Sequence, residues 1–239
     1  MKMSTIKKPL ILAILFLLPV VFLLFLYPST HNYNALDIVH GPVMDIEALI
    51  DEQDKASDFK DNISILLFLG QDPLKNAIGA LNVKELVYDK FKGFKRFQIV
   101  AMIGENNEAS LEELKKELYQ YDDLEYWSFI SANEAETRSI FNGLLSKGAL
   151  KDDLSFEGIF IIDKDLMQRG RKDDRNKTEI KNNSEIYGLY SYNSIEVSEL
   201  KNKISDDMRI LFTEYRQKRK GNFNSSTRRV EDLTSDEKN

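Results

Sequence analysis

The stretch that most constrains this chain is the run Ile-Ser-Ile-Leu-Leu-Phe-Leu-Gly at residues 63–70. Its residues are apolar and favour extended backbone, and the run is too short for a typical helix, so it predicts a buried strand. The polar sequence Gln-Asp-Pro-Leu-Lys-Asn follows at residues 71–76 and predicts a loop that opens a helix. In many α/β domains, the junction between such a strand and helix holds the chemistry.

Further strands and helices follow this run in alternation. Strands are predicted at residues 97–103, 126–130, 158–162 and 187–195. Helices are predicted at residues 82–92, 110–118, 137–145 and 196–220. The first two helices begin at the capping boxes Asn82-x-x-Glu85 and Ser110-x-x-Glu113. The order predicts an α/β domain with a central sheet that is parallel at first and mixed toward its end.

Composition restricts the chemistry that the chain can perform. The chain has 239 residues, no cysteine, two histidines and a net charge of −6 at pH 7. Without cysteine it forms no disulfide, thiolate metal site or iron–sulfur cluster and carries out no thiol redox catalysis. Two histidines argue against a multi-histidine metal centre, and the acidic balance does not favour nucleic acid. We therefore expect no cofactor, no metal and no nucleic-acid partner.

A second apolar run, at residues 10–27, precedes the domain. As a helix at about 1.5 Å per residue it spans roughly 27 Å, close to a bilayer core of about 30 Å. Lys2, Lys7 and Lys8 precede the run, and the next lysine or arginine is Lys55. The positive-inside rule then predicts a cytoplasmic N-terminus and an exported domain, periplasmic in a bacterium. The alternative is a cleaved signal peptide, although its apolar core is usually shorter, about 7–15 residues.

The chain thus divides into five predicted parts. They are a cytoplasmic N-terminus at residues 1–9, a single transmembrane anchor at 10–27, a connector at 28–60, the α/β domain at 61–220 and a disordered tail at 221–239. The tail is polar and lacks an apolar pattern, which is typical of disorder. The expected partners are the membrane and another envelope or membrane protein.

The predicted order of elements over about residues 63–215 resembles the three-layer thioredoxin-like superfamily, and within it the Sco branch. The stretch Leu-Phe-Leu-Gly-Gln-Asp-Pro-Leu-Lys-Asn at residues 67–76 is similar to the Sco strand and its Cys-Pro-x-x-Cys loop. In this register Asp72 and Asn76 stand at the cysteine positions and Pro73 at the proline. Ser155 stands near the position of the family's histidine, and Leu166 replaces the glycine of an Asp-x-x-Gly hairpin.

Membership in the Sco family would imply copper delivery to cytochrome oxidase, or thiol reduction during its assembly. A carboxylate and an amide do not select the soft Cu(I) ion, and the chain has no thiol. We therefore expect a non-catalytic, cysteine-less relative that acts by binding, with Asp72, Pro73 and Asn76 as a degenerate site. The resemblance implies respiratory oxidase assembly as its setting.

A candidate interaction surface combines Arg169 and Arg171 with Tyr187, Tyr190 and Tyr192. Arginine binds carboxylates in a fork geometry, and tyrosine offers apolar area together with a polar tip. The competing interpretations are a solvated, self-paired hairpin for the charged segment and an edge strand packed on the final helix for the tyrosines.

Two other function classes stay open at this point. The first is a structural or scaffolding envelope protein that docks a partner through its final helix and the tyrosine patch. The apolar stripe of that helix runs from Val197 to Tyr215. The second is an enzyme that uses a carboxylate such as Asp72 or Asp163, which requires a strongly perturbed carboxylate in a pocket.

Overall fold

The computed structural model of the chain describes residues 7–26, 35–50, 58–120 and 123–219. It consists of two units, residues 1–34 and residues 35–239. The first unit contains helix α1 (Lys7–Leu26), and the tail predicted at residues 221–239 lies outside the described residues. Within the described part of the chain, no helix is long and apolar enough to cross a membrane. The anchor at residues 10–27 stays a prediction from the sequence.

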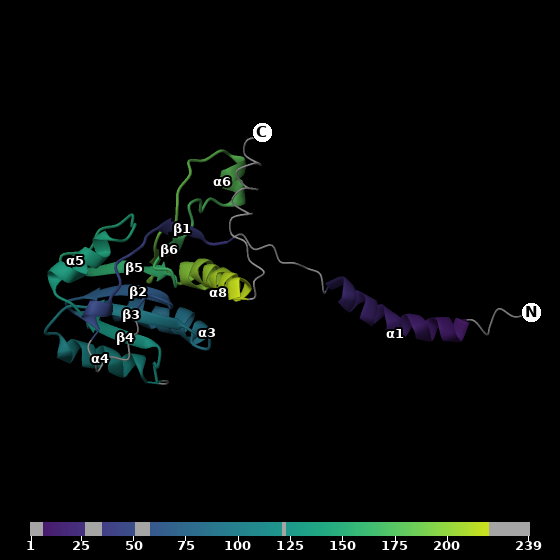
Figure 1. The fold of residues 1–239 in the computed structure, drawn as a ribbon, viewed down its shortest axis with the longest axis horizontal. Helices are drawn as coiled ribbons and strands as arrows, with labels where there is room; N and C mark the ends of the chain where they lie inside the picture. Colours follow the sequence, from purple (N-terminus) through teal and green to yellow (C-terminus); the bar gives the residue numbers. More distant parts are fainter. Residues whose placement is uncertain (1–6, 27–34, 51–57, 121–122, 220–239) are drawn as a thin grey trace, which may run out of the picture. The chain divides into compact units, whose positions relative to one another are not determined.

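The second unit is built on a sheet with the strand order β1-β6-β5-β2-β3-β4, and β7 pairs with β5 (Figure 1). The strands are β1 Asp37–His40, β2 Ile63–Gly70, β3 Phe97–Ile103, β4 Trp127–Ser131, β5 Ser155–Ile162, β6 Gln168–Gly170 and β7 Tyr192–Asn193. β2, β3 and β4 are parallel, whereas β5 pairs antiparallel with β2, β6 and β7. The predicted mixed sheet, parallel at first, is confirmed.

Helical segments connect the strands. They are η1 Glu47–Leu49, η2 Pro73–Asn76, α2 Ala77–Val83, η3 Lys84–Tyr88, α3 Asp89–Phe91, α4 Glu108–Leu118, α5 Glu134–Asn142, α6 Lys177–Lys181, α7 Val197–Glu199, η4 Leu200–Ile204 and α8 Ser205–Arg219. The helix after β2 begins before Asn82, which therefore does not cap it. Instead, the Asn82 amide donates to the Ser194 carbonyl oxygen at 3.0 Å.

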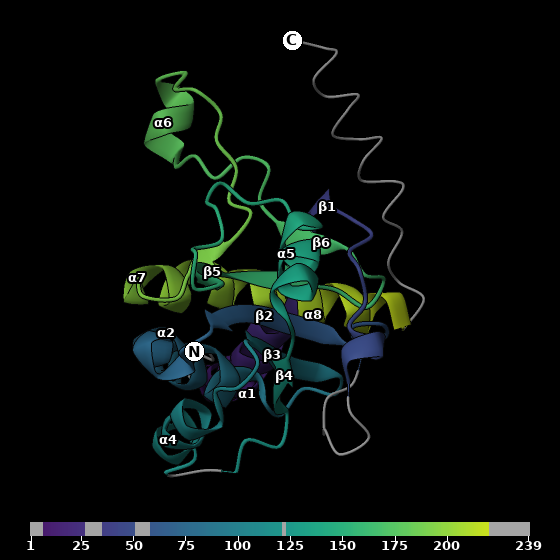
Figure 2. The same cartoon turned by 90° about the vertical axis from the view of Figure 1, so that its left-hand side faces the viewer.

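β2 is buried along its whole length because it lies between two helical layers. Ile65 and Leu67 belong to the core shared with α2, α4 and α8, and α2 and α4 lie side by side there (Figure 2). Leu66 and Phe68 belong to the second core, which α5 covers. Alternate side chains of one strand thus serve both layers, as its uninterrupted apolar sequence requires. The predicted three-layer α/β class with a mixed central sheet is confirmed by this arrangement.

The predicted connector at residues 28–60 is wrong in part, because the folded unit begins at Ala35. β1 adds a strand at the edge of β6, and Val43, Ile46 and Phe59 are buried in the second core. These apolar residues are scattered among polar ones, so they give no helical or alternating pattern that predicts burial.

Gly70 ends β2 in a conformation that only glycine adopts easily, with a φ of +74°. A Cβ atom at this position would lie 2.4 Å from the carbonyl oxygen of Asp153. The chain therefore passes from β2 into the following loop against the backbone that leads into β5. This close approach places the loop next to Ser155.

We predict that Gly70→Ala lowers the free energy of unfolding by about 2–5 kcal/mol, because it combines backbone strain with overpacking against backbone. Urea denaturation followed by circular dichroism measures the change. The matched control is Gly93→Ala, where a Cβ would meet no atom within 4 Å, and it should leave stability unchanged or slightly higher. An equal loss in both variants would contradict the close approach at Gly70.

Candidate functional site

The loop after β2 lies at the same end of the sheet as the start of β5. Leu69 pairs with Ser155 across the two strands. The backbone N–H of Gln71 donates to the carbonyl oxygen of Asp153 at 2.8 Å. The structure therefore brings the predicted loop and Ser155 to one place.

Asp72 connects the loop to helix α4. The Ser110 hydroxyl donates to Asp72 Oδ1 at 2.6 Å and accepts the backbone N–H of Leu74 at 3.1 Å. Lys75 Nζ lies 3.2 Å from Asp72 Oδ2. The hydrogen bond from Ser110, followed by the interaction with Lys75, lowers the pKa of Asp72. Asp72 is thus an ionised hydrogen-bond acceptor that fixes the loop to α4.

Ser110 has a different role from the one its spacing predicts. The predicted capping box places Ser110 at the start of the helix, but α4 begins at Glu108, after Asn107. Ser110 therefore lies within the first turn, and its hydroxyl contacts the loop rather than the end of its own helix. Only the fold reveals this contact, because Asp72 and Ser110 are separated by 38 positions.

Asn76 and Ser155 are also engaged in hydrogen bonds within the domain. Asn76 Nδ2 donates to the carbonyl oxygen of Leu69 at 2.9 Å and closes the loop onto its own strand. The Ser155 hydroxyl donates to Asp153 Oδ1 at 2.6 Å, and this bond lowers the pKa of Asp153. The contributions of Asp153 and Ser110 were not predicted from the sequence.

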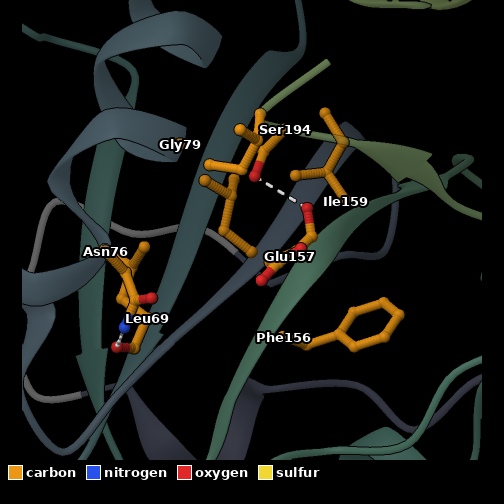
Figure 3. A pocket seen from close by; sticks show the side chains of 9 residues that line it. Leu69, Asn76, Gly79, Phe156, Glu157, Ile159 and Ser194 are labelled. Carbon is orange, nitrogen blue, oxygen red and sulfur yellow. Dashed lines mark hydrogen bonds between the residues drawn. The ribbon is translucent and has the colours of Figure 1, made fainter.

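A small cavity lies behind the loop, between helix α2, strands β2 and β5, and the turn before α7 (Figure 3). Its volume is about 20 Å³, which is room for about one water molecule. Gly79 permits the helix to approach this turn, because a Cβ there would lie 2.6 Å from Ser194 Oγ. The Ser194 hydroxyl in turn donates to the Glu157 carbonyl oxygen at 2.7 Å. This cavity is too small for a substrate.

The groups at the loop do not fit Cu(I). Asp72 offers a carboxylate, Asn76 an amide and Ser155 a hydroxyl, whereas Cu(I) prefers soft thiolate and thioether ligands. Each of the three is also engaged by a neighbour in the chain. No copper step is assigned to these residues.

The predicted interaction surface is wrong for two of its five residues. Arg169 is 3% exposed and Tyr192 is 0% exposed, so both belong to the interior. Arg171 is half-buried, as is Tyr190, and Tyr187 is 40% exposed. The physical reason is that the β6 segment packs under α8, where carboxylates neutralise the two arginines.

Arg169 occupies a buried network that joins three parts of the domain. Its Nε donates to Asp163 Oδ2, and its Nη1 donates to the Leu36 carbonyl oxygen at 2.6 Å. Its Nη2 donates to Glu214 Oε1 on α8 at 3.1 Å. Asp163 Oδ1 additionally accepts the backbone N–H groups of Asp165 and Met167. Both oxygens of Asp163 are therefore taken, which argues against a catalytic role for this carboxylate.

Arg171 forms a second network toward the same helix. Its Nε and Nη2 donate to the two oxygens of Asp207 at 2.9 Å each, and its Nη1 donates to Asp174 at 2.9 Å. The Tyr192 hydroxyl donates to Asp207 Oδ2 at 2.7 Å. The charged segment is thus self-paired only in part, through Arg171 with Asp174 and Arg175 with Asp173. Arg169 and Arg171 also pair with carboxylates of α8, and both sites are largely buried rather than solvated.

Most of the apolar stripe of the final helix is also buried, although Val197 at its start is 41% exposed. Leu200, Ile204, Met208 and Leu211 are all 0% exposed and belong to the first core. The scaffolding hypothesis is therefore wrong in using this stripe to dock a partner. Of the tyrosine patch, Tyr187 and Tyr190 remain at the surface, where Lys147 Nζ lies 5.3 Å and 5.7 Å from their ring centres.

Comparison with known proteins gives structural neighbours only, because neither a family model nor a curated protein matches the sequence. BsSco, a member of the Sco family of cytochrome c oxidase assembly proteins, is 12% identical with a TM-score of 0.45, and 74% of this chain covers 96% of that one. The apo Sco1 protein of Thermus thermophilus is 11% identical with a TM-score of 0.43, at coverages of 76% and 97%. A yeast mitochondrial 1-Cys peroxiredoxin is 14% identical with a TM-score of 0.42, at coverages of 75% and 79%. Because their TM-scores are below 0.5, these similarities do not assign the fold, which is described by its strand order alone.

We predict that Arg169→Met lowers the free energy of unfolding by about 3–5 kcal/mol, because it leaves Asp163 and Glu214 buried without their partner. Urea denaturation measures the effect. Arg209→Met is the control, since Arg209 pairs with Asp206 on the exposed side of α8, and exposed ion pairs stabilise little. If the two variants lose equal stability, the buried network does not hold the helix in place.

We predict that Tyr192→Phe changes how the free energy of unfolding depends on pH in the alkaline range. Burial, followed by the charge of Asp207, raises the pKa of Tyr192 well above 10. Its stabilisation is therefore complete below the unfolded pKa of about 10 and is lost as the pH rises toward the folded pKa. At pH 8 the phenol donates to a carboxylate, so the free energy of unfolding of the wild type should exceed that of Tyr192→Phe by about 1.5–3 kcal/mol.

Urea denaturation at a series of pH values from 8 to about 11 follows this difference. The advantage of the wild type should shrink at the alkaline end. A difference between the two proteins that stays constant over the series would contradict the assigned role of Tyr192.

Proposed function

We propose that this chain is a membrane-anchored, exported thioredoxin-like protein that acts by binding a partner and not by redox or copper chemistry. The observation that carries the proposal is the state of the loop after β2. A side-chain polar group is hydrogen-bonded to a neighbour within the domain in each of Asp72, Asn76 and Ser155. The depressed pKa values of Asp72 and Asp153 keep both carboxylates ionised near neutrality, which is unsuited to a general acid.

The anchor and topology rest on the sequence. The apolar run at residues 10–27 has the length of a membrane span, and the lysines that precede it favour a cytoplasmic N-terminus. On this basis the α/β domain is exported, on the periplasmic side in a bacterium. The division into a terminus at 1–9, an anchor and an exported domain is part of the proposal.

The proposed setting is the assembly of a respiratory oxidase. It follows from the resemblance of residues 67–76 to the Sco strand and loop. In that setting, a protein without cysteine has no means to transfer copper through thiolates or to reduce a disulfide, so it would hold or position another assembly protein.

The alternative is a scaffolding envelope protein that docks a partner through the tyrosine patch. One observation favours it: the excursion that carries α6 stands off the sheet (Figures 1 and 2). Ile180, Ile186 and Tyr187 on this excursion are 50%, 63% and 40% exposed. Exposed apolar and aromatic side chains gathered on a projecting segment are typical of a protein interface.

We predict that the full chain binds Cu(I) more weakly than about 1 µM, because its loop offers only hard donors. Titration against a chromogenic Cu(I) chelator measures the affinity. Asp72→Cys/Asn76→Cys is the matched variant, since it restores two thiolates at the same backbone positions and should bind Cu(I) more tightly. Submicromolar affinity in the wild type would overturn the account of the loop.

A photo-crosslinking amino acid tests the binding function in native membranes. Placed at Tyr187, it should trap a specific protein, whereas the same group at Tyr126 should not, although that residue is 42% exposed on a different face. Mass spectrometry of the product then distinguishes the two settings, since oxidase subunits or their assembly proteins support the first. Catalytic turnover of a substrate with no trapped protein would contradict a binding role.

A further inference from the structure

A groove of about 590 Å³ lies at the opposite end of the sheet from the loop. It is bordered by Ile63 at the start of β2, whereas the loop follows the end of that strand. Eight residues of extended chain separate the two ends by about 26 Å. The groove volume lies in the range of about 300–1,000 Å³ that is typical of ligand sites, and this site is independent of whether the loop is inactive.

Aromatic rings line one side of the groove. Phe94, in the turn before β3, stacks on Phe212 of α8 with ring centres 4.2 Å apart and planes inclined by 23°. Phe94 is nevertheless 45% exposed, and Phe212 is nearly buried. The stacked pair therefore offers an ordered apolar surface that is open to solvent on one side.

Cations from three separate segments surround this surface. Five cations line the groove, namely Lys95, Lys164, Arg216, Lys218 and Arg219, against one carboxylate, Asp165. Among the described residues, no carboxylate forms an ion pair with Lys95, Arg216 or Arg219, or with neighbouring Arg96. The contrast with the fully paired Arg169 and Arg171 is marked, and the chain as a whole carries a charge of −6.

The helix dipole does not account for the whole cluster. It favours cations in the last turn of α8, which explains Arg216, Lys218 and Arg219. Lys95 and Lys164 come from the turns before β3 and after β5. Burial, followed by the charges of Arg96 and Arg219, lowers the pKa of Lys164, so these cations repel one another. An anionic ligand would relieve that repulsion.

We infer that this groove binds an acidic peptide segment of a partner protein, with one apolar side chain of the peptide on Phe94 and its carboxylates on the surrounding cations. Charge complementarity selects the acid, and the exposed aromatic surface selects a ligand that also carries an apolar group. The concave shape favours a peptide over a bilayer surface, which is flat on this scale and cannot enter a groove.

Fluorescence anisotropy of the full chain in detergent tests the inference, with a labelled ten-residue peptide of Asp and Glu around one Phe. Lys95→Glu/Arg216→Glu should weaken binding at least tenfold. Lys116→Glu/Lys201→Glu is the control, because it makes the same change in net charge at exposed cations outside the groove. Phe94→Ala should weaken binding of this peptide but not of its Phe→Ser counterpart.

Three outcomes would overturn the inference. Equal losses in the two charge-reversal variants would mean that only net charge matters. Displacement of the peptide by dihexanoyl phosphatidylglycerol, a soluble anionic lipid, in a manner that requires Lys95 and Arg216 would identify a lipid site. If the peptide binds only after Glu231, Asp232, Asp236 and Glu237 are replaced by their amides, the chain's own C-terminal segment is the occupant.

Discussion

The domain depends on a positive charge that is held in its interior. Arg169 would be costly to bury alone, and it is stable there because Asp163, Glu214 and the Leu36 carbonyl oxygen surround it. These partners come from the end of β5, from α8 and from the segment before β1. A single guanidinium therefore fixes the final helix and the N-terminal edge strand against the same hairpin. Arg171, two residues further along the chain, repeats the arrangement with Asp207 of α8.

Hydrogen bonds within the domain also engage the polar side chains of the loop after β2. In a thiol or copper protein of this fold, the loop must leave its ligands free to react. Here Ser110 holds Asp72, the Leu69 carbonyl oxygen holds Asn76, and the cavity behind them has room for about one water molecule. The loop is a structural connection between β2, α4 and β5. Under the proposed function, the partner would bind to surfaces elsewhere on the domain.

The sequence predicted the parts of the fold that repeat a simple pattern. β2 and β3 are almost entirely apolar, and β5 ends in an apolar run at residues 158–162, so their burial and order could be inferred before the structure. β1 and β7 have only four and two residues and show no alternation, so their pairing depends on the tertiary fold. The burial of Arg169 could not be predicted, because Glu214 lies 45 positions away. At the site, the loop was located correctly, but its partner Ser110 was assigned to a helix cap.

The most direct test of a domain that acts through its surface is a comparison of two full-length variants in native membranes. Asp72→Asn/Asn76→Ala changes the loop, and Ile186→Glu/Tyr187→Glu changes the projecting excursion. The proteins that copurify with each variant are quantified against the wild type by mass spectrometry, after circular dichroism has shown that both are folded. Retention of the partner by the loop variant and its loss from the excursion variant is the predicted result. Loss from the loop variant alone would place the function at the loop and contradict the account.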